Sequence, residues 1–316
     1  MTSVPSSSPP LHSIAFVVGV LAICFASLPN ALSTIDEVAT IEICTTPIFD
    51  FMSRSMLGWI RIGFSAFIFI IAALRFLDTS TLTVNYLKGT KLKMMPIYFT
   101  GWKNQMAFTS WSWNLLGCSF AFSGLLTLYV DDLAKEYDPS EIILFPHMKL
   151  VSRICILLFE ISAPAAMLVS VVVKYVLWPK ALAGNGSANL KQFKILLQHN
   201  ANIIMCLVEV GLLGGLPVRL ADMALAPLFG IVYILFAWSV RFRWVPSGDA
   251  QFLYFFLDTT LGKTSTIALL GLLVMQLLFY GIFMLVDDVI LLFGGNFATH
   301  ALMVTIFSCL VCRFRD

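Results

Sequence analysis

The residues of this chain that could do chemistry are a few polar side chains inside long apolar stretches. His199, Asn202 and Glu209 follow one another at i, i+3 and i+10, so they share one face if the segment is a helix. Thr109 stands near the start of another apolar stretch. A hydroxyl beside an imidazole is the minimal pair for nucleophilic catalysis, because an alcohol is inert until a base takes its proton. Thr109 and His199 are therefore the candidate catalytic pair.

The two residues are predicted to lie at a similar depth in a membrane. Thr109 is the fourth residue of the apolar stretch 106–130, and His199 is the fifth residue of 195–216. Both stretches follow a basic loop, so the two helices are expected to run in parallel. Glu209, ten residues after His199, is expected roughly 15 Å deeper at the helical rise. It is therefore a supporting residue and not a partner of the hydroxyl.

Each candidate also has a structural interpretation. A threonine in a membrane helix usually bonds the carbonyl of its own preceding turn. His199 can cap or anchor a helix start at the interface, and Glu209 can hold a bundle together by accepting hydrogen bonds. If an ester is attacked, the oxyanion needs donors, for which Asn200, Asn202 and the indole of Trp111 are the candidates.

The composition indicates that the whole chain, including these candidate residues, lies in a membrane. The chain has 316 residues, of which 59% are hydrophobic and 12% charged, with a mean hydropathy of +0.89. A soluble domain carries about 25% charged residues, so this chain cannot cover a water-exposed surface. The net charge is +2 and no basic run is present, which argues against a nucleic-acid partner. No metal-binding motif occurs, and no metal or organic cofactor is expected.

Six apolar stretches are long enough to cross the roughly 30 Å hydrocarbon core as helices. They predict an all-α, polytopic transmembrane bundle with a core at 56–294, and the stretches are 56–76, 106–130, 148–177, 195–216, 223–240 and 264–286. Residues 14–33 predict an additional membrane segment behind a Ser/Pro-rich, disordered tail at 1–12. Residues 295–316 predict a C-terminal membrane or interfacial segment.

Charge alternates between the connecting loops and predicts their sidedness. Loops 77–105, 178–194 and 241–263 carry ten of the 20 lysines and arginines, which places them in the cytoplasm. Both termini are then cytoplasmic if the two additional segments also span. The glycosylation sequon at Asn185 would be silent on that side. The sequence leaves open which membrane holds the protein.

Several motifs along the core resemble one known family. Phe108-Thr109-Ser110-Trp111 resembles the F-T-x-W segment of the androgen-induced (FAR-17a, ADTRP-like) transmembrane hydrolase family, to which rolling stone is distantly related. His199 with a glutamate ten residues later is similar to the family's second mark. The helix from Gly230 through Tyr233 to Trp238 is similar to its G-x-x-Y-x-L-x-x-W helix. The similarity covers about 56–294, and Thr100 is a competing match that lies in the preceding loop.

The resemblance implies an activity. Vertebrate members of the family hydrolyse fatty acid esters of hydroxy fatty acids with a membrane-embedded threonine and a histidine. It therefore implies Thr109 as the nucleophile, His199 as the base, Tyr233 as a supporting residue, and a lipid ester from the surrounding membrane lipids as the substrate.

The alternative is a non-enzymatic multi-pass protein, either transporter-like or a component of adhesion or fusion. Transport sites commonly form where membrane helices are broken near the midplane. Glu160 with Pro164, and Glu209 with Gly214 and Gly215, fit that description. A water-lined tunnel through this region would favour transport, and a closed apolar pocket at Thr109 and His199 would favour hydrolysis.

Overall fold

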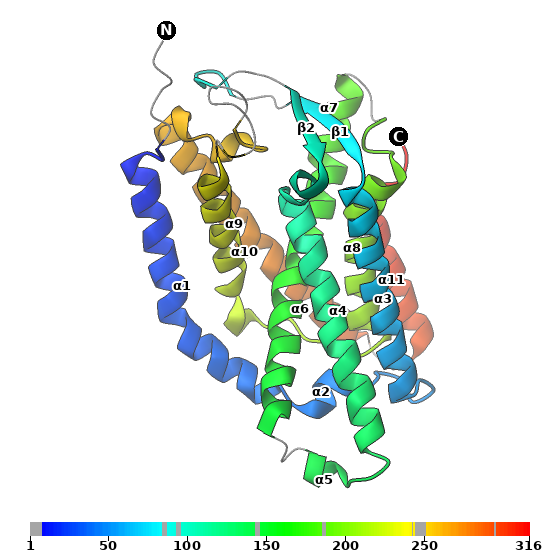
Figure 1. Ribbon diagram of the computed structural model, residues 1–316. Helices are drawn as coiled ribbons and strands as arrows, with labels where there is room; N and C mark the ends of the chain where they lie inside the picture. Colours follow the sequence, from blue (N-terminus) through cyan, green and yellow to red (C-terminus); the bar gives the residue numbers. More distant parts are fainter. Residues whose placement is uncertain are drawn as a thin grey trace.

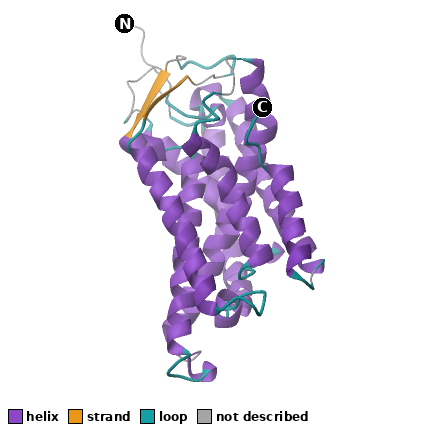
Figure 2. Ribbon diagram, turned by 90° about the vertical axis from the view of Figure 1, so that its right-hand side faces the viewer, coloured by secondary structure: helices purple, strands orange, loops and turns teal. Residues whose placement is uncertain are grey.

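The computed structural model describes residues 8–83, 87–92, 96–142, 146–184, 188–241, 243, 251–293 and 295–316. Within them, the chain is a bundle of long helices with one short two-stranded hairpin at one end (Figures 1 and 2). Seven of the described helical segments are long and apolar enough to cross a membrane. The predicted all-α, polytopic membrane bundle is thus confirmed.

The long helices account for the predicted spans. They are α1 (Leu11–Val38), α3 (Arg54–Phe76), α4 (Phe108–Leu133), α6 (Pro146–Val172), α8 (Phe193–Leu212), α9 (Leu225–Val240) and α10 (Lys263–Leu292). Helix α6 continues through a π-helical turn (Val173–Leu177) into α7 (Trp178–Ala183). The shorter elements are α2 (Ile41–Thr45), strands β1 (Thr79–Thr83) and β2 (Pro96–Thr100), α5 (Pro139–Ile142), α11 (Phe297–Val311) and 3-10 turns at Gly101–Gln105, Leu220–Asp222, Phe255–Leu257 and Thr259–Leu261.

Successive long helices run in opposite directions, and the start of α1 lies at the same end of the bundle as the C-terminal residues after α11 (Figure 1). We call this the hairpin end, because β1 and β2 cover it; the opposite end, where α2 and α5 lie, is the α5 end. Strand β1 pairs with β2 in antiparallel register from Thr79 opposite Thr100. The hairpin connection is held to the segment before α10, since the amide of Lys91 donates to the hydroxyl of Thr260 over 3.0 Å.

Helices α3 and α4 approach closely along a line of glycines. A β-carbon at Gly117 would lie 2.7 Å from a methyl carbon of Ile68, and one at Gly124 would lie 3.0 Å from Ile62. The hydroxyl of Ser65 donates to the carbonyl of Gly117 over 2.9 Å. Small residues of this kind let membrane helices pack at short range where lipid offers no hydrophobic driving force. This packing fixes the start of α4 beside the end of α3.

The outer surface is apolar, as a lipid-facing surface must be. Along α10, Ile267, Leu270, Val274 and Leu278 are exposed. Helix α1 lies at the edge of the bundle, where the hydroxyl of Ser13 is hydrogen bonded to that of Thr266 in α10 over 2.7 Å. The predicted segment 14–33 falls inside this helix.

The structure differs from the predicted stretches at two helix ends and in one loop. The stretch 195–216 ends as a helix at Leu212, because the chain turns at Gly214 and Gly215, the latter with φ +65°. The stretch 264–286 continues to Leu292, and loop 77–105 contains the hairpin. The sequon at Asn185 lies outside the described residues, and the sidedness of the loops stays a prediction.

Candidate functional site

The start of α4 and the turn before it are held by three side-chain hydrogen bonds. Tyr233 of α9 donates its hydroxyl to the carbonyl of Met106 over 2.9 Å. Ser110 donates to the carbonyl of Asn104 over 2.9 Å, and the Asn104 amide donates to the carbonyl of Asp78 over 3.0 Å. Ala107 occupies the N-cap position and supplies no side-chain acceptor. The N-cap residue therefore offers no side-chain acceptor to the first amides of the helix.

Thr109 is the second residue of α4 and is half-buried. Tyr254, from the segment before α10, interacts with its hydroxyl and with the backbone of Phe108. Burial raises the pKa of Tyr254, while these two interactions and the charge of Arg75 act in the opposite direction. At neutral pH Tyr254 is therefore a neutral phenol that can donate a hydrogen bond beside Thr109.

His199 is the seventh residue of α8, and its Nδ1 atom is buried without a hydrogen-bond partner. The neighbouring Gln198 accepts a hydrogen bond from Arg75, at the end of α3. Arg75 is also the charged group that acts on the His199 ring. Arg75 therefore lies close to both His199 and Tyr254, so the end of α3 connects the two halves of the candidate pair.

The structure brings Thr109 and His199 to the same end of the bundle, but not into direct contact through Nδ1. That nitrogen has no partner in the described part of the chain. Thr109 is the second residue of α4 and His199 the seventh of α8. Both helices begin at the hairpin end and run in the same direction (Figure 1), and a direct contact between the two side chains stays a prediction.

Aromatic rings surround the start of α4. Trp111 packs against Phe236 with ring centroids 4.6 Å apart and against Tyr233 at 5.5 Å. The ring of Phe108 lies 5.2 Å from that of Tyr233, and the rings of Tyr233 and Tyr254 are 6.3 Å apart. Trp111 and Tyr233, both predicted as supporting residues, thus belong to an aromatic cluster at the start of α4.

The two asparagines considered as oxyanion donors are engaged elsewhere. The Asn200 amide donates to the carbonyls of Leu196 and Arg313, at 2.9 and 3.0 Å, and its oxygen accepts from the Arg313 amide at 2.8 Å. Asn202 accepts from the hydroxyl of Ser170 in α6 over 3.1 Å. Asn200 therefore anchors the C-terminal segment, and its amide serves two backbone carbonyls. Asn202 ties α8 to α6, where its amide donates to the carbonyl of Ala166 over 3.5 Å.

Glu209 belongs to a separate, fully buried ion pair with Arg61 of α3. Two guanidinium nitrogens bind the two carboxylate oxygens, at 2.5 and 3.1 Å, and both side chains are 0% exposed. Arg61 also donates to the carbonyl of Cys44 over 2.6 Å and to the hydroxyl of Thr127 over 2.9 Å. Sequence reasoning missed Arg61, although a single arginine inside an apolar stretch is a signal in its own right.

Glu160 lies in a second buried cluster. One of its carboxyl oxygens accepts from the backbone amide of Arg219 over 3.1 Å, and the carboxyl group interacts with that of Asp222. The other oxygen of Glu160 and one oxygen of Asp222 have no partner. Tyr280 of α10 closes the cluster by donating to the carbonyl of Arg219 over 2.8 Å. This second site is distinct from Thr109 and His199.

Comparisons with protein-family models, with curated proteins and with solved structures find no match for this chain in any of the three. Among the described residues, no group of three or more histidine, cysteine or acidic side chains is arranged to hold a metal ion.

Proposed function

We propose that the protein is an intramembrane lipid-ester hydrolase in which Thr109 is the nucleophile and His199 the base. The observation that carries the proposal is the buried, unpartnered Nδ1 of His199 at the end of the bundle that also holds Thr109. Burying a polar atom without a partner costs free energy, and active sites are where such groups are retained. Resemblance to the androgen-induced hydrolases supports the same two residues.

The reaction follows the chemistry of an activated alcohol. His199 takes the proton of the Thr109 hydroxyl, and the threonine oxygen attacks the ester carbonyl to form an acyl-enzyme. His199 then gives the proton to the departing alcohol. In the second half, it takes a proton from water, whose oxygen attacks the acyl group. The bond between the acyl carbon and the Thr109 oxygen then breaks, His199 returns the proton to that oxygen, and the fatty acid is released.

The oxyanion donors in this scheme come from the start of α4. The amide of Thr109 belongs to the first turn, where backbone donors have no intrahelical acceptor, and the helix dipole favours negative charge there. Tyr254 adds a neutral hydroxyl beside the nucleophile. These groups replace Asn200 and Asn202, which are bound elsewhere.

The substrate class follows from the surroundings of the nucleophile. Phe108, Trp111, Tyr233 and Phe236 are aromatic neighbours of the site. An ester of a long-chain alcohol or hydroxy fatty acid matches these apolar side chains, and it reaches them from the surrounding lipid.

The test is hydrolysis of a fluorogenic long-chain ester by purified protein in lipid nanodiscs. Thr109→Ala and His199→Gln are each expected to lower the turnover number by at least about 10³-fold, and the double variant is expected to lose little more. Matched controls are Thr305→Ala, an exposed threonine that bonds the carbonyl of its own helix, and His300→Gln, a buried histidine bonded to Gly211. Full activity in Thr109→Ala, with the control variants also active, would contradict the proposal.

The second candidate is a proton-binding membrane protein without enzymatic activity, supported by Glu160 and Asp222. Both side chains are 0% exposed and lie side by side inside the bundle. Carboxyl groups buried inside a membrane bundle commonly mark ion or proton pathways. Proton flux into proteoliposomes that is abolished by Glu160→Gln and retained by Asp132→Asn, on an exposed aspartate, would favour this function.

A further inference from the structure

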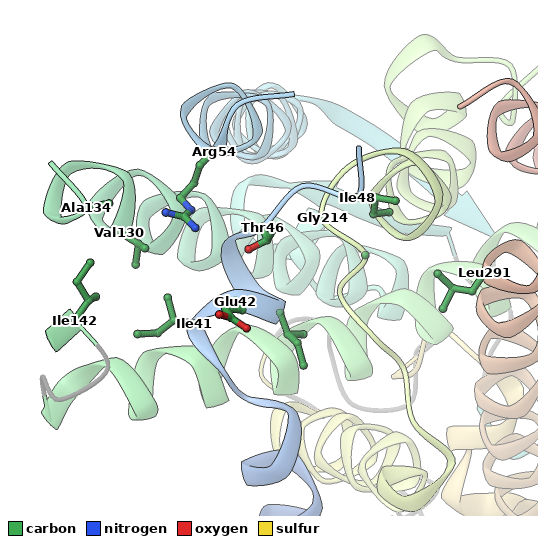
Figure 3. Close-up of a pocket in the computed structure, with 12 residues that line it drawn as sticks. Ile41, Glu42, Thr46, Ile48, Arg54, Val130, Ala134, Ile142, Gly214 and Leu291 are labelled. Atoms are coloured by element: carbon green, nitrogen blue, oxygen red, sulfur yellow. The ribbon is translucent and has the colours of Figure 1, made fainter. Parts of the chain in front are cut away.

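A pocket of about 520 Å³ opens at the α5 end, far along the bundle from Thr109 and His199. It lies between α2, the first residue of α3, the end of α4, α5, the turn after α8 and the end of α10 (Figure 3). Most of its lining side chains are apolar, among them Ile41, Ile43, Val130, Ile142 and Leu291. A volume of this size is in the range that binds small organic molecules.

Two charged side chains line the pocket. Arg54 reaches it from α3 and Glu42 from α2, with the hydroxyl of Thr46 close to both (Figure 3). No ion pair among the described residues includes Arg54 or Glu42. The Nε atom of Arg54 is moreover buried without a hydrogen-bond partner. A guanidinium with a desolvated, unused donor is a binding group that lacks its ligand.

The pocket lies at the level of the membrane where lipid headgroups are expected. Helix α3 begins at Arg54, and a membrane helix leaves the hydrocarbon near its end. Phe51 and Trp59 flank this start and are 65% and 63% exposed. Exposed aromatic side chains of this kind gather at the level of the headgroups. Arg54 is therefore close to the phosphates of one leaflet.

We propose that this pocket binds a zwitterionic phospholipid, with the phosphate on Arg54, the headgroup ammonium toward Glu42, and an acyl chain against the apolar wall. A guanidinium binds phosphate through two parallel hydrogen bonds. A carboxylate in the same pocket attracts the ammonium of a zwitterion and repels a headgroup that carries only negative charge. The paired charges of the pocket therefore favour phosphatidylethanolamine over phosphatidylglycerol.

The inner wall of the pocket is backbone at Gly214 and Gly215. A β-carbon at Gly214 would lie 2.0 Å from Nη2 of Arg61, so glycine is required where the chain crosses the buried ion pair. The bound lipid would thus cover the backbone at Gly214 and Gly215 from the outside. The lipid site is independent of the proposed hydrolysis.

The test is native mass spectrometry of the full-length protein, titrated with phosphatidylethanolamine, phosphatidylglycerol or soluble phosphoethanolamine. We expect phosphatidylethanolamine to bind most tightly. Arg54→Gln is expected to weaken it about tenfold or more, since a charge-assisted hydrogen bond is lost. Glu42→Gln should reduce the preference over phosphatidylglycerol. Lys135→Gln and Asp132→Asn are the matched controls, because they remove the same charges from an exposed pair at the same end of the bundle.

Arg54→Lys separates folding from binding, because it keeps the charge and loses the two-pronged contact. It is expected to bind with intermediate affinity. Equal binding of phosphatidylglycerol, equal binding of soluble phosphoethanolamine, or unchanged affinity in a folded Arg54→Gln protein would each overturn the proposal.

Discussion

Replacement of Glu209 by glutamine tests the buried ion pair most directly. In the native protein, the guanidinium of Arg61 makes two contacts to the Glu209 carboxylate, one to the carbonyl of Cys44 and one to the hydroxyl of Thr127. Glutamine has nearly the same volume as glutamate, so the substitution leaves no cavity. It removes the negative charge. It also replaces one carboxylate oxygen, a hydrogen-bond acceptor, by the NH2 of the amide, a donor that faces an N–H donor of the Arg61 guanidinium.

The magnitude follows from what remains around Arg61. One guanidinium donor loses its acceptor, which costs about 1–3 kcal/mol for a buried group. Arg61 also loses the counter-charge with which it forms an ion pair, in a site that is 0% exposed. Breaking one side of such a buried pair destabilises a protein by about 3–5 kcal/mol. We therefore expect the free energy of unfolding to fall by about that amount in Glu209→Gln.

The measurement is reversible unfolding in mixed micelles, titrated with a denaturing detergent. Replacing both partners, as in Arg61→Met with Glu209→Leu, removes the buried charge altogether and should recover most of the loss. Thr127→Ala should cost only about 1.5–3 kcal/mol, because one hydrogen bond to a charged group is lost. A loss below about 1 kcal/mol in Glu209→Gln, within the range of an exposed ion pair, would refute the reasoning.

Two further predictions use other parts of the molecule. Gly117→Ala should lower the free energy of unfolding by about 1–3 kcal/mol through overpacking, because its β-carbon would lie 2.7 Å from Ile68. The control is Gly271→Ala, which has open space around it and should be neutral or stabilising in the same detergent titration. Burial raises the pKa of Cys312, one residue beyond α11, to about 12, so at pH 7–9 it stays a protonated thiol. Mass spectrometry after maleimide treatment should then find Cys309, which is exposed, modified and Cys312 unmodified; equal labelling of the two would contradict this.

The helices were predictable because hydropathy alone determines which segments can cross a membrane. Apolar length identified the segments of α3, α4, α6, α8, α9 and α10. The helix ends were less predictable, because they depend on tertiary contacts. The turn at Gly214, for example, is required by the guanidinium of Arg61, which lies far away in the sequence.

The candidate site was predictable in position but not in detail. The predicted directions of the helices placed Thr109 and His199 toward one end of the bundle, and α4 and α8 both begin at that end. Periodicity shows which residues share a face but not which neighbour that face meets. Asn200 therefore appeared to belong to the site, although it binds Arg313. Tyr254 reaches Thr109 from the aromatic segment before α10, and helix periodicity gives no information about which residue such a segment contacts.

The ion pair between Arg61 and Glu209 also imposes an order on biosynthesis. The two residues are 148 positions apart in the chain, so at 5–20 residues per second α3 waits roughly 7–30 s for its counter-charge during translation. An isolated arginine near the middle of a helix disfavours its release into lipid. Thr127 arrives 66 residues after Arg61 and supplies only a neutral acceptor. Helix α3 is therefore expected to remain beside the insertion machinery, paired with α4, until α8 emerges and completes the core.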